Sequence, residues 1–564
     1  MATRSKNPRT PFSVSITPSH LHHCLLLSPK KRLRQYPSHT PKLFSFTSPN
    51  LSLLFLFLFL FLFTFVGISK IYLLPISDRS MRWDVFPSSS SPFPSFSSLP
   101  LFLTSHFVSN WGGDSSECLE SAMMPFPINR FGLNLTDEEQ EFWRQPDRLG
   151  YGPCIEFGIE YRKASARIVN EKRKFLMVVV SGGLNQQRNQ IIDAVVVARI
   201  LEAALIVPIL KVNMVWEDES EFSDIFDVEH FKRTLKSDVW IVSSLPSTHL
   251  IPKSSIGNRI PINASPLWIR TRFLKQLNEE GLLLLNGGFD SKLSKNLPLD
   301  LQRLRCKVAF HALRFVAPIR ELGNLMARRM RTEGPYIALH LRLEKDVWIR
   351  TGCLPGLGPE YDGIIKRERE SQPELLTGSL NMNSHDRKLA GLCPLNALEV
   401  ARILKALGAP RSARVYMAGG EPFGGLQALQ PLKAEFPNLV KKEMLAFNGE
   451  LEHFANRSSV LAAIDYIVSL NSDVFMPSHG GNMGSALQGH RAYVGHRKYI
   501  KPNKRVILQL LMETSLSNAE FSVAMKRLHR GLLGQPEIRT KKGERDVIAY
   551  PVPECMCKRR TVLF

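Results

Sequence analysis

The feature that most constrains the fold is a buried-type strand that ends at a double glycine and leads into a helical pattern. Lys174–Val180 (KFLMVVV) is apolar after its first position, and Gly182 and Gly183 interrupt the pattern. Apolar residues then recur near the helical period through Gln186–Leu205, and Leu205–Leu210 follows as a second strand. This order is a βαβ unit, which predicts a parallel sheet and an α/β fold.

The same order of strands and helices returns in the second half of the sequence. Further strands are predicted at Tyr336–Arg342, Arg414–Ala418, Asn438–Glu443 and Asp473–Met476, and helices at Ala397–Leu407, Gly425–Phe436, Val460–Leu470 and Gly484–Tyr493. We therefore predict two Rossmann-like lobes, residues 126–330 and 331–515, with a cleft between them. Residues 355–390 lack periodicity and predict a long loop, and residues 516–564 predict a basic C-terminal tail.

The N-terminal part of the sequence has a different composition from the two lobes. Residues 1–77 contain nine Lys and Arg and no Asp or Glu. Within them, Leu51–Ile68 is an uncharged apolar run that would span roughly 27 Å as a helix, close to the hydrocarbon thickness of a bilayer. We predict a basic, disordered cytosolic tail (1–50), a transmembrane signal anchor (51–68) and a stem (69–125).

The basic residues on the N-terminal side of the apolar run set its orientation. The positive-inside rule leaves the N-terminus in the cytosol and places both lobes in a lumen, which predicts a single-pass type II membrane protein. No small-residue cleavage site follows the run, as a retained anchor requires. The Ser-, Thr- and Pro-rich, acid-free N-terminus also suits an organelle transit peptide, so a plastid enzyme is the alternative.

A lumenal location would allow the cysteines to form disulfides and two sequons to be glycosylated. Seven of the eight cysteines follow the apolar run, which allows three disulfides with one cysteine left over. Asn134 and Asn456 begin N-x-S/T sequons and are predicted glycosylation sites.

The charge of the lobes favours an anionic ligand. The protein has a net charge of +22, and beyond residue 77 it has 64 Lys and Arg against 51 Asp and Glu. This balance suits a nucleotide diphosphate or an acidic polysaccharide, and a generally basic solvated surface is the alternative interpretation. No RNA- or DNA-binding motif is present, so nucleic acid is not a predicted partner.

Two catalytic motifs are absent from the sequence. No D-x-D lies between apolar strands, so no catalytic metal is predicted. No G-x-S-x-G is present, so no lipase-type nucleophile is predicted.

The first loop has the residues that an anion site needs. Gly182 and Gly183 allow a tight turn and a close approach of the backbone to a ligand. The helix that follows offers free N–H groups, while Asn185 adds a polar side chain and Arg188 a cation. Neither GxGxxG nor GxxxxGK[ST] is present, so this is not a dinucleotide or Walker loop. Glycines required only for packing are the alternative interpretation.

The second segment, His340–Asp346 (HLRLEKD), places charge on an otherwise apolar strand. On a strand His340, Arg342 and Glu344 would share one face. The planar fork of Arg342 suits phosphate oxygens and would neutralise a departing diphosphate. Glu344, with Asp346 second, is the candidate general base. An internal Arg–Glu pair beside a satisfied histidine is the alternative.

The third segment has the same order as the first, with a strand, a pair of glycines and the start of a helix. Pro477–Met483 (PSHGGNM) follows a strand and opens a helix, so Ser478 and the backbone of Gly480–Asn482 are predicted to hold a phosphate. Asp473, at the start of the strand, is predicted to orient a base or a ribose, or else only to cap the strand.

Taken together, GGLNQQR, HLRLEKD and SHGGNM followed by GHR resemble the plant O-fucosyltransferase family over Lys174 to Lys504. The resemblance implies a GT-B-like fold in a Golgi type II membrane protein. It also implies inverting, metal-independent transfer of fucose from GDP-fucose to a hydroxyl of a protein or cell-wall glycan, with no cofactor. Leu343 and Val347 stand where the family often has Phe and Met, which is a mild apolar change.

The resemblance also implies roles for single residues. Asn185 would lie near donor and acceptor, Arg342 would stabilise the leaving group, Asp473 would read the nucleotide, and Ser478 with its neighbours would cradle the phosphate. The predicted catalytic residues are Arg342, Glu344 and Asp346. The predicted donor-binding residues are Gly182, Gly183, Asn185, Arg188, His340, Arg342, Asp473, Ser478, His479, Gly480, Gly481 and Asn482.

Two other functions suit the same residues. Some members of the family that the motifs resemble transfer rhamnose to pectin, so a UDP-rhamnose-dependent transferase is one alternative. A non-catalytic Golgi membrane scaffold that kept the fold is the other. The acceptor is not predicted beyond a protein or a polysaccharide.

Overall fold

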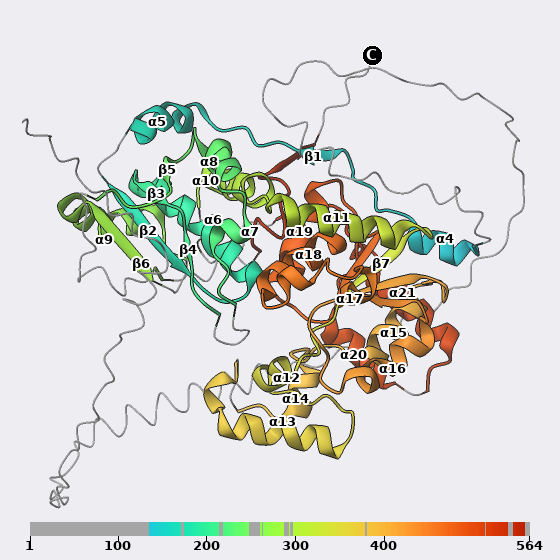
Figure 1. Ribbon diagram of the computed structural model, residues 1–564. Helices are drawn as coiled ribbons and strands as arrows, with labels where there is room; N and C mark the ends of the chain where they lie inside the picture. The colour runs from blue at the N-terminus through green and yellow to red at the C-terminus, as the bar shows by residue number, and fades with distance from the viewer. Residues whose placement is uncertain are drawn as a thin grey trace, which may run out of the picture. The chain divides into compact units, whose positions relative to one another are not determined.

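The computed structural model shown in Figure 1 describes most of the protein from Leu135 to Lys558. The described residues are 135–558 without 171–173, 214–217, 248–259, 262, 287–292, 294–296, 378–380, 514 and 540–544. The predicted tail, anchor and stem (1–125) and the sequon at Asn134 lie outside them. Within the described residues, no helix has both the length and the apolar character needed to cross a membrane.

The first sheet is built on β2 (Phe175–Val180), all six residues of which are buried. It pairs in parallel with β3 (Ala204–Ile206) and β4 (Ile209–Leu210) on one side and with β6 (Leu282–Asn286) on the other, and β3 pairs with β5 (Ile241–Val242). The parallel sheet predicted from the βαβ pattern is confirmed.

The predicted strand Leu205–Leu210 is interrupted in the structure. It consists of β3 and β4, separated by Val207 and Pro208. Proline has no N–H to give to a neighbouring strand, which explains the break.

The helix after the double glycine, α6 (Leu184–Leu201), is buried almost all round. It ends four residues before the predicted Leu205 because Glu202 takes a left-handed conformation with φ 54°. Its buried polar side chains have partners: Gln190 bonds both ways with the backbone of Ser181, and Asp193 pairs with Arg305 at 3.0 Å. A helix with no solvated face fits a position between two layers of structure.

The second sheet is also wholly parallel, with the order β11-β10-β7-β8-β9. Its strands are β7 (Tyr336–His340), β8 (Arg414–Ala418), β9 (Leu439–Lys441), β10 (Val474–Pro477) and β11 (Lys498–Tyr499). Strand β7 ends two residues before the predicted Arg342. The N–H of Arg342 donates to the Ser478 side chain instead of a neighbouring strand, at 2.9 Å.

The predicted helices of the second half are confirmed, with ends that move by one or two residues. They are α15 (Ala397–Ala406), α16 (Gly425–Glu435), α18 (Ser458–Asn471) and α19 (Asn482–Tyr493). The predicted boundary at residue 330 puts α11 (Ala317–Arg331) in the first lobe. In the structure α11 packs along α18, a helix of the second half.

The two sheets share one apolar core. Tyr336 and Ala338, on one face of β7, belong to the same buried cluster as Val178 of β2. Ile337 and Leu339, on the other face of β7, belong to a second cluster with α15 and α16. The alternation follows the period of a strand, and the helices between the sheets are packed from both sides.

The prediction of a long loop at residues 355–390 is wrong. The segment contains α13 (Pro359–Ser371) and α14 (Ser384–Leu389), which lie beside α12 (Lys345–Thr351) in Figure 1. Helix α13 buries only Ile365, so its sequence has no apolar stripe for periodicity to detect.

The prediction of a C-terminal tail after residue 515 is wrong for the described residues. Helix α21 (Asn518–His529) packs on α15, and β12 (Met556–Lys558) pairs antiparallel with β1 (Tyr151–Pro153). The other helices are α4 (Asp137–Trp143), α5 (Ile159–Asn170), α7 (Phe222–Ile225), α8 (Val228–Leu235), α9 (Pro266–Glu280), α10 (Leu299–Lys307), the π-helix η4 (Val308–Ala312), η5 (Pro373–Leu375), α17 (Lys442–Leu445), η6 (Glu452–Phe454) and α20 (Lys504–Met512).

Three disulfides are present among the described residues, and they use all six cysteines there. They are Cys154–Cys557, Cys306–Cys555 and Cys353–Cys393. Cys555 and Cys557, which are two residues apart, therefore bond to different partners, and these two bonds connect the segment around β12 to the first α/β half.

The Cys353–Cys393 bond is expected to contribute strongly to stability. It closes a 40-residue separation across the helices that replace the predicted loop. Replacing both cysteines with serine should lower the free energy of unfolding by about 4 kcal/mol, because the unfolded protein regains loop entropy. Urea denaturation of the variant against the parent protein measures this, and a loss below about 1 kcal/mol would contradict it.

Candidate active site

The carboxyl ends of strands from both sheets border one pocket with a volume of about 640 Å³. This volume is within the range of small-molecule sites, about 300–1,000 Å³. Eight predicted site residues line it: Gly182, Gly183, Asn185, His340, Arg342, Glu344, Asp346 and Asn482. The loops after β2, β7 and β10 therefore meet as predicted, because ligands of parallel sheets bind at the carboxyl edge of the strands.

The glycine turn after β2 forms part of one wall of the pocket. Gly182 has φ +91°, and a Cβ there would lie 2.3 Å from Oε1 of Gln186, so the turn requires glycine. Helix α6 starts at the pocket, and Asn185 in its first turn accepts a hydrogen bond from Nη1 of Arg188 at 3.2 Å. Arg188 itself is buried behind Asn185, with its guanidinium 4.4 Å from the centre of the Tyr466 ring. The structure does not bring Arg188 to the pocket surface.

Arg342 lies where β7 ends, with 30% of its side chain exposed. Its Nε donates to Oε2 of Glu344 at 3.3 Å. This is the internal Arg–Glu pair that the sequence analysis gave as the alternative to a phosphate-binding role. Among the described residues, its two terminal nitrogens have no hydrogen-bond partner. The pair holds one edge of the guanidinium and leaves the fork that binds phosphate available.

His340 lies beside Arg342 and is buried. Its Nδ1 has no hydrogen-bond partner among the described residues. Burial, reinforced by the charges of Arg342 and His479, lowers the pKa of His340 to about 3, so the ring is neutral. A buried polar atom without a partner at the wall of a pocket is expected to meet a ligand or a water.

The loop after β10 divides into a buried part and an open part. Ser478 is buried behind the Arg342 backbone, and His479 lies against Lys504, with Nδ1 and Nζ 3.0 Å apart. A Cβ at Gly480 or Gly481 would have no atom within 4 Å, so the backbone there faces open space. These four residues do not line the pocket themselves, but they lead directly into Asn482, which does.

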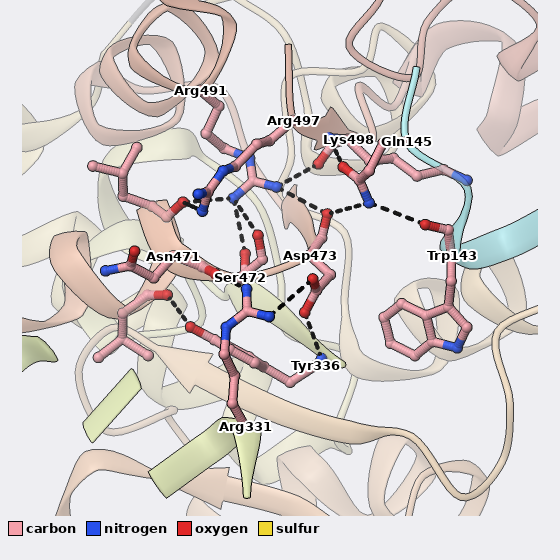
Figure 2. Close-up of polar contacts among 12 residues, drawn as sticks. Trp143, Gln145, Arg331, Tyr336, Asn471, Ser472, Asp473, Arg491, Arg497 and Lys498 are labelled. Atoms are coloured by element: carbon pink, nitrogen blue, oxygen red, sulfur yellow. Dashed lines mark hydrogen bonds and ion pairs between the residues drawn. The ribbon is translucent and has the colours of Figure 1, made fainter. Parts of the chain in front are cut away.

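The structure places Asp473 at the opposite edge of the second sheet, which corrects the prediction that it reads the nucleotide. Asp473 precedes β10, so it lies at the amino end of the strand while the pocket lies at the carboxyl end. Its carboxylate is buried, pairs with Nη1 of Arg331 at 3.2 Å and accepts from the Tyr336 N–H at 3.0 Å (Figure 2). The apolar strand between Asp473 and Ser478 puts the two residues at different ends of the sheet.

Figure 2 shows further cations around Asp473. Arg491 is fully buried and donates to the carbonyls of Ser469, Ser472 and Asp473. Burial, reinforced by Arg497, lowers the pKa of Arg491 to about 9. These carbonyls end α18 and start β10, so the cluster fixes the joint between the helix and the strand.

One wall of the pocket, formed around the loop after β8, was not predicted from the sequence. Asp465 of α18 accepts hydrogen bonds from the Tyr416 hydroxyl (2.6 Å), the Gly419 N–H (3.1 Å) and Lys442 Nζ (3.2 Å). Burial raises the pKa of Asp465 although Lys442 opposes the shift. A single carboxylate within an apolar helix was the signal that could have found it.

Other pocket residues were also missed. They are Asn213, Arg350, Met417, Gly420, Glu421, Lys441, Glu443 and Ser458. The glycine turn at 419–420 follows a strand, as the two predicted loops do. This position after a strand could have identified it as part of the site. Within the described part of the protein, no group of three or more His, Cys, Asp and Glu residues is arranged to hold a metal ion.

Buried histidines are expected to make the fold sensitive to acid. Burial lowers four pKa values from 6.5, to about 3 for His340 and His490 and about 4 for His311 and His479. Below pH 6.5 the unfolded protein takes up protons that the folded protein does not, so stability should fall as the pH drops toward 4. Asp193 and Asp465 have raised pKa values and oppose the trend, but the histidines outnumber them.

At pH 5.5 each such histidine should cost about 1 kcal/mol of stability relative to pH 7.5. Urea midpoints measured at pH 7.5, 6.5 and 5.5 test this, because most carboxylates stay ionised over that range. A midpoint that does not change with pH would contradict the neutral state of these rings.

A model of the family described as GDP-fucose protein O-fucosyltransferase matches residues 175–494, which include every residue that lines the pocket. O-fucosyltransferase 37 of Arabidopsis thaliana is 66% identical over 441 residues, covering 78% of this chain and 79% of that protein. O-fucosyltransferase 20 of Brassica napus is 53% identical over 536 residues, covering 95% and 92%.

Solved structures show a weaker similarity. A crystal structure of POFUT1 in complex with GDP matches with 12% sequence identity and a TM-score of 0.36, over 58% of this chain and 99% of that chain.

Proposed function

This chain belongs to the GDP-fucose protein O-fucosyltransferase family, and we propose that it moves fucose from GDP-fucose to a hydroxyl of a protein or cell-wall glycan. One observation carries the proposal: Arg342 presents two terminal nitrogens, which have no hydrogen-bond partner in the described part of the chain, at a pocket that both sheets border. A guanidinium held by one edge is suited to the paired oxygens of a diphosphate.

The proposed reaction inverts the sugar and uses no metal ion. The bond between C1 of fucose and the diphosphate oxygen breaks with its electron pair remaining on the diphosphate. The acceptor oxygen bonds to C1 from the opposite face and loses its proton. Arg342 neutralises the charge that develops on the leaving group. The open backbone at Gly480 and Gly481 and the first turn of α19 are suited to its phosphates.

Asp346 is the better-placed carboxylate to receive the acceptor proton. It lines the pocket, and 26% of its side chain is exposed. Its Oδ2 lies 3.7 Å from Nε of Arg350, a loose pair that leaves the carboxylate oxygens accessible. A carboxylate within reach of an acceptor hydroxyl is suited to general base catalysis.

We also propose the cellular setting. Two parallel α/β halves around one pocket suit a GT-B-like arrangement in which residues 331–515 bind the nucleotide. The apolar run 51–68 would anchor the enzyme in the Golgi membrane as a type II protein, and Asn456, exposed before α18, would carry a glycan. A fluorescent fusion that reports Golgi or plastid location tests the anchor against a transit peptide.

Titration of the full-length protein with GDP and UDP, followed by incubation with labelled GDP-fucose and UDP-rhamnose, tests the function. At least tenfold tighter binding of GDP, with transfer or slow hydrolysis of fucose, is the expected result. A preference for UDP would support a rhamnosyltransferase instead. Failure to bind either nucleotide would support a non-catalytic scaffold.

A further inference from the structure

Glu344 has an unusual position for a carboxylate at the start of a helix. It is the N-cap residue of α12, a position where the preferred residues Ser, Thr, Asp and Asn accept a hydrogen bond from the first turn of the helix. The Glu344 side chain makes no such bond. It extends across the pocket wall and leaves the first turn of α12 without a side-chain cap.

Both oxygens of that carboxylate are already occupied. Oε2 accepts from Nε of Arg342 at 3.3 Å, and Oε1 accepts from the N–H of Gly420 at 3.1 Å. Only 21% of the Glu344 side chain is exposed. A carboxylate engaged by two donors is a poor acceptor for the proton of a substrate hydroxyl.

The glycine turn that anchors Glu344 is itself fixed. The N–H of Gly419 donates to Oδ2 of the buried Asp465 at 3.1 Å. Gly419 has φ +128°, and a Cβ there would lie 2.8 Å from the carbonyl oxygen of Leu341. A Cβ on Gly420 would lie 3.2 Å from Cγ of Glu344. The loops after β7 and β8 therefore approach each other closely, and Glu344 bridges them.

From these contacts we propose that Glu344 is a positioning residue for Arg342 and not the general base. Its carboxylate holds the Nε edge of the guanidinium, while the backbone of Arg342 is held by Ser478. The two terminal nitrogens are then oriented before the diphosphate arrives, which lowers the entropy lost on binding. This inference rests on the proposed function.

Single variants distinguish positioning from base catalysis. Glu344→Ala removes both acceptors and should lower kcat/KM by about 10- to 100-fold, as expected for a misplaced catalytic group. Glu344→Gln keeps one acceptor oxygen and should retain activity between that of the wild type and that of Glu344→Ala. A general base would make both variants equally inactive.

A double-mutant cycle tests whether Glu344 acts through Arg342. Lysine has no Nε, so in an Arg342→Lys background Glu344→Ala should cost about threefold or less. An equal loss in both backgrounds would overturn the inference. Glu368→Ala is the matched control, since it removes another carboxylate paired nearby, with Lys345 at 2.6 Å, and should leave kcat/KM unchanged.

Two readouts keep the result interpretable. Melting temperatures of all variants show whether an activity loss reflects unfolding, and Glu344→Gln serves if Glu344→Ala does not fold. GDP titration of the wild type is measured first. A wild type that neither binds GDP nor releases fucose refutes the proposed function itself. A wild type that does both, with no coupling between positions 342 and 344, refutes only the positioning role.

Discussion

Replacing Arg342 with alanine is expected to lower kcat/KM for fucose transfer by about a thousandfold or more while the protein stays folded. A cation aimed at the developing charge of a leaving group contributes about 10²- to 10⁵-fold in comparable sites. The fold should tolerate the change because the side chain is partly exposed, and Glu344 is its one partner among the residues that the structure describes. An ion pair of that kind contributes about 0–1 kcal/mol to stability.

Steady-state kinetics with GDP-fucose and a thermal melt of the same preparation measure the two effects. Arg342→Lys keeps the charge but loses the fork, so its activity should lie between those of wild type and Arg342→Ala. Arg367→Ala, on the exposed side of α13, is the matched control and should have wild-type kinetics. Full activity in Arg342→Ala would remove the main support for the proposed reaction.

Asp473→Ala is expected to have the opposite profile, with a large loss of stability and unchanged affinity for GDP in the protein that remains folded. The Asp473 carboxylate is buried and faces Arg331, with Arg491 and Arg497 close by (Figure 2). Removing it leaves buried cations without their counter-ion, which typically costs about 3–5 kcal/mol. For a folded part of this size the melting temperature should fall by about 4–5 °C.

The measurement is a denaturant titration together with GDP titration of the variant at low temperature. Asp137→Ala, at an exposed position in the first turn of α4, is the control and should change stability by less than about 0.5 kcal/mol. If Asp473→Ala kept its stability and instead bound GDP weakly, the aspartate would read the nucleotide after all. Its distance from the pocket edge makes that outcome inconsistent with the structure.

Most of the strands could be located from the sequence because parallel strands are buried on both faces. A continuous apolar run marks such a strand, and the predicted Arg414–Ala418 has the observed bounds. Elements without that property were missed. Helix α13 is stabilised without an apolar stripe, and β11 is two residues long, too short for any period to be detected.

The site was predictable where position along a strand determines position in space. Gly182, Arg342 and Asn482 all follow strands, so they meet at one edge. Asp473 belongs to the same motif as Ser478, yet it precedes the strand and lies at the other edge. Asp465 could not be found in this way, because it lies within α18 and not after a strand. The signal there was a single carboxylate in an otherwise apolar helix.

The pairing of β12 with β1 has a consequence for how the protein is made. Cys154 bonds to Cys557 across a sequence separation of 403 residues, so that link cannot form until the ribosome has produced nearly the whole described body. A premature stop codon just before Cys555 would spare both sheets and the entire pocket. It would nevertheless leave Tyr151–Pro153 without its strand partner, and Cys154 and Cys306 as free thiols.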